Sequence, residues 1–246
     1  MPPLSTQNGW LIPTQLFDGH DLHAGQALRV ENGHIAEIAS ASQAQHAKQP
    51  VTHLQGTLSP GFFDTQVNGG AGLMFNNLPT AHTLHHIGQA LSQHGTTAWL
   101  PTFITDAPER MALAAQAIKE VLASNDKAGV VGVHFEGPHI SHARRGAHLA
   151  QWIRPIDELS YALLQDLRER GIPVLLTLAP ECQPAGSIRR LCAMGVVVAI
   201  GHSAANSVQV QQALDEGASC FTHLFNGMTP MSAREPGVVG AALDST

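Results

Sequence analysis

The sequence predicts an α/β protein: a (β/α)8-type TIM barrel, incomplete at about six strands, that follows a small N-terminal β segment. Two observations support this prediction. After residue 57, apolar runs alternate with helical segments, and a glycine closely precedes five of the runs. Polar residues directly follow several runs, as the C-terminal face of a barrel requires. We therefore expect a small β-sandwich segment at 1–57 and a partial barrel at 58–246.

The N-terminal segment contains short extended pieces between residues 10 and 57. Leu28 and Val30 alternate with polar residues before Asn32-Gly33, which predicts a β-hairpin with its turn at that dipeptide. Residues 40–48 are polar and without periodicity, so we expect a surface connection there.

The barrel is expected to use six strands, at residues 58–68, 97–103, 130–135, 174–178, 196–200 and 219–224. Helices separate them; Asp106-Ala-Pro108-Glu109, for example, is typical of a helix start and predicts a helix to Leu122. Strands this apolar are covered on both faces and run parallel. No Gly-x-Gly-x-x-Gly turn is present, which favours a barrel over a doubly wound dinucleotide-binding sheet. Eight strands close such a barrel, so we expect its last strands to lie beyond Thr246.

Composition narrows the function. The 246 residues include 13 Lys+Arg and 19 Asp+Glu, a formal net charge of -6, which leaves too few cations for a nucleic-acid partner. The three cysteines show no Cys-x-x-Cys spacing, and we expect a reducing, cytoplasmic setting. The first five residues lack the pattern of an export signal, and no apolar stretch approaches ~18 residues, so no membrane association is expected.

Three residues at strand ends could share a metal ion. Glu136 follows one predicted strand, His202 follows another, and His223 lies at the end of a third. Two imidazoles and a carboxylate can hold Zn²⁺ and leave a position for water, whose pKa the metal lowers to about 7. The alternative is that the histidines are hydrogen-bonded surface groups and that Glu136 caps a turn.

Six ordered motifs then match a known family. They are Leu58-Ser-Pro-Gly-Phe-Phe-Asp-Thr-Gln-Val-Asn-Gly69, His134-Phe-Glu-Gly-Pro138, Gly146-Ala-His148, Gly201-His-Ser203, Thr222-His-Leu-Phe-Asn226 and Arg234-Glu-Pro-Gly237. Together they resemble the N-acetylglucosamine-6-phosphate deacetylases of the amidohydrolase superfamily. The resemblance covers essentially the whole sequence and implies that Glu136, His202 and His223 are the metal ligands.

The resemblance also bears on the number of metals. Gln66 and Asn68 stand where many amidohydrolases have His-x-His, and an amide is a weak ligand for a second transition metal. One divalent ion is therefore expected: zinc first, with iron, cobalt or manganese as alternatives. Gln66 could touch the metal, directly or through water, or could simply hydrogen-bond a neighbouring loop.

The resemblance further implies a substrate-binding set of Ala147, His148, Asn226, Gly227 and Arg234. His148 is expected beside the acetamido carbonyl, where it stabilises the oxyanion. Arg234 matches an arginine that binds the sugar phosphate, often from the neighbouring subunit, which implies a homodimer. Its alternative is an ordinary surface arginine paired with Glu235.

Other polar residues have weaker claims. The family's general-base aspartate falls beyond Thr246, and no residue here matches it. Asp64 could lie near the metal, although a buried hydrogen-bonded support is the better interpretation, and Asp244 matches no motif. His82, His85 and His86 have helical spacing without a carboxylate partner and are expected on a solvent-facing helix.

The sequence thus predicts hydrolysis of the acetamido group of N-acetylglucosamine 6-phosphate to glucosamine 6-phosphate and acetate by a metal-activated water, in amino-sugar catabolism. One alternative is another amidohydrolase that acts on a cyclic or peptide amide and binds two metals. The other is a non-catalytic remnant that binds metal or sugar phosphate, and we expect little or no turnover from these 246 residues alone.

Overall fold

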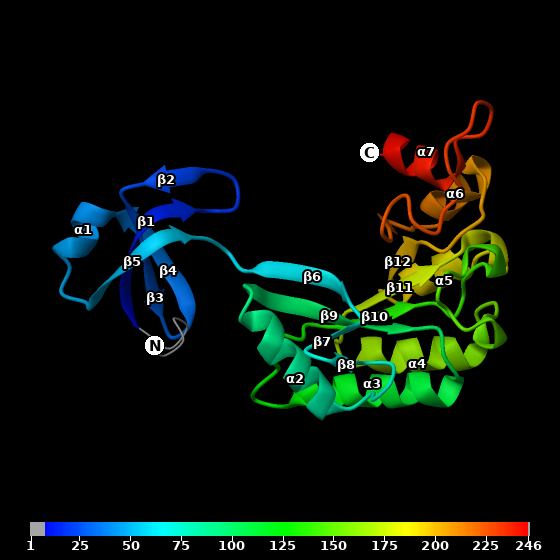
Figure 1. Cartoon of the computed structure of the whole chain (residues 1–246), viewed down its shortest axis with the longest axis horizontal. Helices are drawn as coiled ribbons and strands as arrows, with labels where there is room; N and C mark the ends of the chain where they lie inside the picture. Colours follow the sequence, from blue (N-terminus) through cyan, green and yellow to red (C-terminus); the bar gives the residue numbers. More distant parts are fainter. Residues whose placement is uncertain (1–7, 246) are drawn as a thin grey trace. The chain divides into compact units, whose positions relative to one another are not determined.

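The computed structural model describes residues 8–245; the N-terminal residues considered for an export signal, and Thr246, lie outside it. The chain divides between Gly61 and Phe62 into two units, each with its own core (Figure 1). Within the described residues no helix combines the length and apolar character needed to cross a bilayer.

The first unit is built on a five-stranded sheet. Its strand β1 pairs antiparallel with β2 and β3 and parallel with β5, and β4 pairs with β3. Small groups of apolar side chains on β1 and β3 are buried, among them Trp10, Leu16 and Leu28. The strands are β1 (Gly9–Phe17), β2 (Leu22–Ala24), β3 (Gln26–Glu31), β4 (His34–Ser40) and β5 (Val51–Leu58).

The hairpin predicted at Asn32-Gly33 is present. Asn32 and Gly33 link β3 to β4 with φ of 51° and 76°, the left-handed pair that a tight hairpin turn requires. The surface connection expected at residues 40–48 is wrong in part, because helix α1 (Ala41–Gln45) forms there. Ser40 accepts a hydrogen bond from the backbone of Gln43, whose side chain reaches back to the Ser40 backbone, and this capping box starts the helix.

The second unit contains a six-stranded parallel sheet with the order β13-β12-β11-β10-β9-β6. Large apolar side chains from the sheet and its covering helices form the main core, including Trp99, Phe103, Phe135 and Leu176. The strands are β6 (Phe62–Val67), β9 (Thr96–Ile104), β10 (Val133–Glu136), β11 (Val174–Leu178), β12 (Val197–Ile200) and β13 (Cys220–Phe221); β7 (Gly69–Gly70) and β8 (Leu73–Met74) form a small separate ladder.

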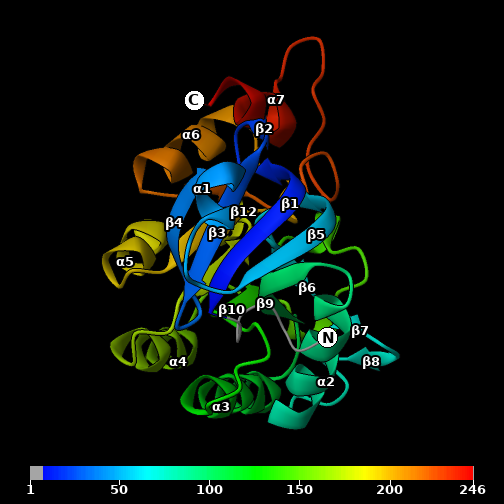
Figure 2. The ribbon, with the colours of Figure 1, turned by 90° about the vertical axis from the view of Figure 1, so that its left-hand side faces the viewer.

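Helices connect the parallel strands, as the alternating pattern predicts. Helices α3 and α4 pack side by side along one face of the sheet (Figures 1 and 2). The helices of this unit are α2 (Ala81–Ser92), α3 (Pro108–Ala123), α4 (Glu158–Glu169), α5 (Ser187–Ala193), α6 (Ser207–Asp215) and α7 (Gly237–Asp244). The glycines that precede five strands all have positive φ: Gly95, Gly129, Gly171, Gly195 and Gly217.

Several boundaries differ from the expected ones. The first strand of the second unit starts at Phe62, and Leu58 instead ends β5, because Pro60 has no N–H for a sheet ladder. The third strand starts at Val133; Val130 makes only an isolated bridge to Trp99. Helix α3 has no side-chain cap, since Asp106 accepts a hydrogen bond from Ala107 and pairs with Arg110.

The six parallel strands form a curled, half-barrel sheet; the eight strands and the closure of the expected TIM barrel are not seen in the described residues. One side of the sheet carries an apolar hollow of about 740 Å³, whose lining includes Phe63, Val131, Leu175 and Val197. The carboxyl ends of the same strands carry the polar residues singled out by the sequence.

Candidate metal centre

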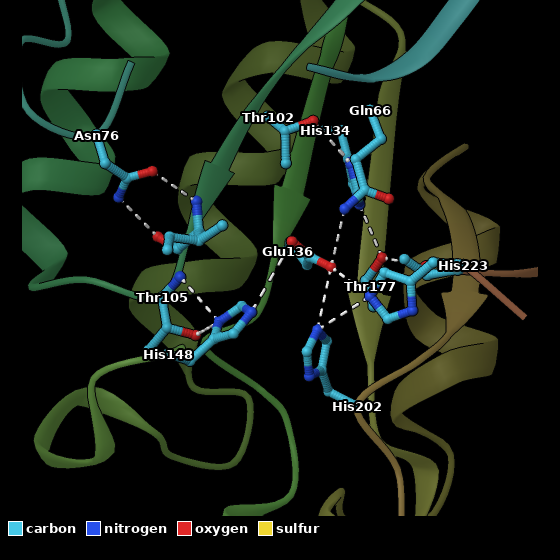
Figure 3. A network of polar contacts seen from close by, with 12 residues as sticks. Gln66, Asn76, Thr102, Thr105, His134, Glu136, His148, Thr177, His202 and His223 are labelled. Carbon is cyan, nitrogen blue, oxygen red and sulfur yellow. Dashed lines mark hydrogen bonds and ion pairs between the residues drawn. The ribbon is translucent and has the colours of Figure 1, made fainter. Parts of the chain in front are cut away.

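Three side chains from different strands meet at the carboxyl edge of the parallel sheet (Figure 3). Glu136 ends β10, while His202 and His223 follow β12 and β13. Glu136 Oε1 lies 3.2 Å from His202 Nε2 and 3.0 Å from His223 Nε2, and the two Nε2 atoms are 3.1 Å apart. The fold therefore brings together the three residues that the sequence analysis singled out.

Both histidines have unusual backbone conformations. His202 has a φ of 47° and His223 a φ of 34°, in the left-handed region that residues other than glycine rarely adopt. Such strain costs about 1–3 kcal/mol and tends to occur at functional sites. The turns after β12 and β13 thus hold both rings at the sheet edge at the expense of local stability.

Gln66 also contacts this group. Its Nε2 donates a hydrogen bond of 3.1 Å to Glu136 Oε1, so its amide nitrogen faces the carboxylate. Asp64, expected as a buried support, is exposed; its Oδ1 accepts a hydrogen bond from the Gln66 backbone. The reason is that β6 is an edge strand, paired only with β9 in the described sheet.

His148 lies on the other side of Glu136, with its Nε2 at 3.8 Å from Glu136 Oε2. Its Nδ1 is 2.7 Å from Thr105 Oγ1 and accepts a hydrogen bond of 3.4 Å from the Thr105 backbone N–H. The ring is 4% exposed and packs edge-to-face on His202, with centroids 4.4 Å apart. His148 is therefore within reach of anything that Glu136 and His202 hold.

A second set of side-chain hydrogen bonds joins His134 to threonines of the neighbouring strands. His134 precedes Glu136 by two residues on β10 and so lies on the same face of the sheet. His134 Nδ1 is 3.1 Å from Thr102 Oγ1 on β9, and its Nε2 is 2.7 Å from Thr177 Oγ1 on β11. Thr177 Oγ1 is in turn 2.6 Å from Thr222 Oγ1. Side-chain hydrogen bonds thus tie together the strands that carry the site.

The charges at the site are strongly coupled. Burial favours a raised pKa for Glu136, but hydrogen bonds from His202 and His223 outweigh it and hold the pKa of this carboxyl well below its usual range. The hydrogen bond to Glu136 raises the pKa of His223. Burial lowers the pKa of His134 and of His148 to about 4, so both rings are neutral at pH 7. The site keeps an ionised carboxylate among imidazoles.

The donor atoms fit a divalent cation. His202 Nδ1 lies 2.8 Å from the Arg144 carbonyl oxygen, which can only accept, so Nδ1 carries a hydrogen and Nε2, beside Glu136, is the ring atom left to bind a cation. Ligand atoms about 2.0–2.1 Å from tetrahedral Zn²⁺ lie about 3.3 Å apart, close to the observed spacing. Donor atoms of Glu136, His148 and His202 also lie within 4.8 Å of one another, which makes His148 a geometric rival of His223 as the third ligand.

The remaining predicted residues lie on loops. Ala147 is exposed beside buried His148. A Cβ at Gly227 would lie 3.2 Å from His202 Nδ1, so Gly227 is close to the site, whereas the Asn226 side chain is exposed. Arg234 is exposed on the loop before α7. Glu235 accepts hydrogen bonds from the backbones of Ser207 and Gly237, so the proposed Arg234–Glu235 pair is not formed.

The residues with weaker claims lie on helices α2 and α7. His82, His85 and His86 lie on helix α2, as expected. His85 does have a carboxylate neighbour, because Asp126 Oδ2 lies 3.8 Å from its Nδ1. Asp244 ends helix α7 and is exposed.

Sequence reasoning missed Thr102, Thr105, Thr177 and Asn76. Asn76 hydrogen-bonds both the N–H and the C=O of Ile104 and so fixes the backbone beside Thr105. His134 carried a usable signal, its two-residue offset from Glu136 on a strand. The threonines carried none, since nothing in their local sequence distinguishes them from ordinary strand residues.

No family model matches the chain. Individual relatives do. The sequence is 48% identical over 223 residues to the N-acetylgalactosamine-6-phosphate deacetylase of Shewanella sp. (strain ANA-3), a match that covers 89% of this chain and 55% of the relative. It is 35% identical over 238 residues to the N-acetylglucosamine-6-phosphate deacetylase of Haemophilus influenzae, with 96% of this chain and 61% of the relative covered.

A solved structure agrees with these relatives. The N-acetylglucosamine-6-phosphate deacetylase from Pasteurella multocida superimposes with a TM-score of 0.90 at 36% identity, over 96% of this chain and 62% of that one. The chain thus spans between 55% and 62% of these three proteins. The resemblance indicated by the sequence motifs is confirmed.

Proposed function

We propose that this chain, a relative of the N-acetylhexosamine-6-phosphate deacetylases, supplies the metal-binding and amide-binding side chains for hydrolysis of the acetamido group of N-acetylglucosamine 6-phosphate. The products are glucosamine 6-phosphate and acetate, as needed in amino-sugar catabolism. The convergence of Glu136, His202 and His223 within 3.0–3.2 Å is the observation that carries the proposal.

Glu136, His202 and His223 would hold one divalent ion, zinc first and iron, cobalt or manganese as alternatives, with Gln66 as an auxiliary contact. When bound, such an ion polarises a carbonyl and makes water acidic enough to be deprotonated near neutral pH. Glu136 contributes an ionised carboxylate, because its hydrogen bonds hold its pKa low. Its buried position, 3% exposed, also keeps bulk water away from the reacting groups.

The other residues would bind substrate. His148 would donate from Nε2 to the acetamido carbonyl oxygen, where negative charge builds up in the transition state. The backbone near Ala147 and Gly227 and the side chain of Asn226 would contact the sugar. Arg234 would bind the phosphate of a substrate in a neighbouring subunit, which makes the active form a homodimer; its exposure leaves the guanidinium free to reach outward.

Two broader expectations belong to the same proposal. The six parallel strands would correspond to part of an eight-stranded barrel, with the site on its C-terminal face. The protein would work in the reducing cytoplasm, consistent with free thiols at Cys182, Cys192 and Cys220.

Metal stoichiometry tests the proposal directly. Purified protein dialysed against Zn²⁺ should retain about one ion per chain by elemental analysis. Glu136→Gln should lose it, because the variant replaces an anionic ligand by a neutral amide, whereas Glu120→Gln, on the exposed face of α3, should retain it. Two tightly held ions per chain would favour the rival amidohydrolase with two metals, and none in the wild type would refute the site.

The sugar needs its own test, because the 48% identical relative is named for the galactosamine epimer. N-Acetylgalactosamine 6-phosphate is therefore the second candidate substrate. Calorimetric titration of the zinc-loaded protein with both epimers should show the preference, while an acetate-release assay in parallel should show little or no turnover. Binding that is equally tight for glucosamine 6-phosphate, which lacks the acetyl group, would contradict an amide-binding site.

A further inference from the structure

We propose that Thr105 is a positioning residue that fixes the ring hydrogen of His148 on Nε2, so that His148 donates a hydrogen bond into the site and does not ligate the metal. The inference rests on the proposed function only for the identity of the group that receives this hydrogen bond.

The first step concerns the two contacts at His148 Nδ1. The Thr105 backbone N–H points at this nitrogen over 3.4 Å, and a backbone N–H can only donate. The Thr105 hydroxyl lies 2.7 Å from the same nitrogen. Among the described residues, this hydroxyl has no other hydrogen-bond partner, so its hydrogen also goes to Nδ1. A neutral ring that accepts at Nδ1 carries its hydrogen on Nε2.

The neighbouring ring of His202 also faces Glu136 (Figure 3), but its Nδ1 has a different kind of partner. Its Nδ1 donates to the Arg144 carbonyl oxygen over 2.8 Å, which leaves Nε2, at 3.2 Å from Glu136 Oε1, as the ring atom that can bind a metal. The two rings contact each other beside Glu136, yet the Nδ1 of His202 donates to a carbonyl oxygen, whereas the Nδ1 of His148 accepts from the Thr105 backbone N–H. A metal ligand needs the lone pair, so this difference separates His202 from His148.

The second step concerns the rigidity of Thr105 itself. The amide of Asn76 hydrogen-bonds the Ile104 backbone at 2.9 and 3.1 Å, immediately before Thr105. The Arg110 guanidinium contacts the backbone oxygens of Asn76 and Asn77 and pairs with Asp106 at 3.0 Å. The peptide that aims the Thr105 N–H is therefore held on both sides.

The third step concerns the space around the Thr105 side chain. Gly137 follows Glu136 directly, and a Cβ there would lie 2.3 Å from Thr105 Oγ1. The side chain of Thr105, 1% exposed, is thus confined between Gly137 and the His148 ring. Because the hydroxyl cannot move away, it keeps its hydrogen bond to Nδ1 and leaves Nε2–H directed towards Glu136.

The test is a direct measurement of ring hydrogens. Long-range ¹H–¹⁵N spectra of the metal-free protein, assigned with His148→Gln, should show the hydrogen of His148 on Nε2. Thr105→Val removes the hydroxyl at nearly constant volume and should introduce a population with the hydrogen on Nδ1. Thr105→Ser keeps the hydroxyl and should restore the wild-type spectrum. A wild-type ring with its hydrogen on Nδ1, or a Thr105→Val spectrum without change, would overturn the inference.

Metal and ligand binding complete the test. Zn²⁺ should shift the ring-nitrogen signals of His202 and His223 while His148 keeps its Nε2–H; loss of that hydrogen on metal addition would make His148 a ligand and contradict us. Thr105→Val should still bind one ion but should bind N-acetylglucosamine 6-phosphate about tenfold more weakly, with recovery in Thr105→Ser. The spectra use neither metal nor sugar. Failure to bind the sugar would therefore count against the proposed function alone.

Discussion

At the residue scale, the candidate site depends on positions where only a small side chain fits. Gly137 has a φ of 79° and lies against Thr105, and Gly227 has a φ of 62° and lies against His202. A glycine at each point lets two loops approach the polar side chains closely. The candidate metal and substrate residues therefore depend on neighbours that contribute no chemistry of their own.

Gly137→Ala tests this close approach. The new Cβ would lie 2.3 Å from Thr105 Oγ1, and the alanine would have to adopt the left-handed backbone conformation of Gly137. We expect the free energy of unfolding to fall by about 2–4 kcal/mol, since the backbone strain and the overpacking add. Gly171→Ala, with a φ of 74° and no atom within 4 Å, is the matched control and should cost about 1–2 kcal/mol. Equal losses in urea unfolding would show that the Thr105 contact is unimportant.

His139 gives a pH dependence outside the candidate metal centre. Burial lowers its pKa to about 4, and its ring faces the Arg154 carbonyl and the charges of Arg154 and Asp157. Between pH 6.5 and 4 the unfolded chain binds a proton that the folded chain does not, so stability falls as the pH falls and levels off below about 4. The loss is on the order of 3 kcal/mol.

Urea unfolding across this pH range measures the effect. His139→Gln should flatten the decline in stability, whereas His82→Gln, at an exposed position of α2, should leave it unchanged. A decline of the same steepness in His139→Gln would assign the acid sensitivity to other groups.

At the scale of elements, helix α4 shows how one face is buried and the other is not. Leu167 is 0% exposed and packs in the main core, while Leu159 on the same helix is 70% exposed. The helix also carries a surface interaction, in which Arg190 of α5 pairs with Glu158 at 2.6 and 2.8 Å and lies over the Tyr161 ring. Exposed pairs of this kind contribute little, so core packing holds the helix.

Leu167→Ala should therefore lower the free energy of unfolding by about 2–5 kcal/mol, through lost contacts and the cavity that remains. Leu159→Ala is the matched control on the same helix and should change it by no more than about 0.5 kcal/mol. Urea denaturation of both variants checks the difference. Similar costs would mean that helix propensity rather than packing dominates α4.

Elements were largely predictable because their signals are local. Glycines with positive φ precede the strands, and the Asn32-Gly33 turn follows from two residues. The metal candidates could be found because strand ends meet at one edge in a parallel sheet. The roles of Thr105 and Asn76 could not be predicted, because they depend on which ring nitrogen of His148 the Thr105 backbone N–H faces. Helix α1 was missed because its capping box lies in a polar stretch without periodicity.

At the scale of the whole molecule, the chain has separate cores on either side of Gly61. Calorimetry should therefore resolve two unfolding transitions. Leu11→Ala, at a residue 3% exposed in the first unit, should lower the midpoint temperature of that smaller unit's transition. Leu167→Ala should lower the midpoint temperature of the transition of the larger, second unit. A single transition that moves with both substitutions would show that the units unfold together.

The apolar hollow of the parallel sheet has a calorimetric consequence. Phe63, Val131 and Val197 line it while remaining 57%, 40% and 45% exposed. Apolar surface that is already hydrated in the native state adds nothing to the heat-capacity increment of unfolding. The transition of the second unit should therefore show a heat-capacity increment below the usual ~12–15 cal/mol/K per residue. Its free energy of unfolding should vary correspondingly little with temperature.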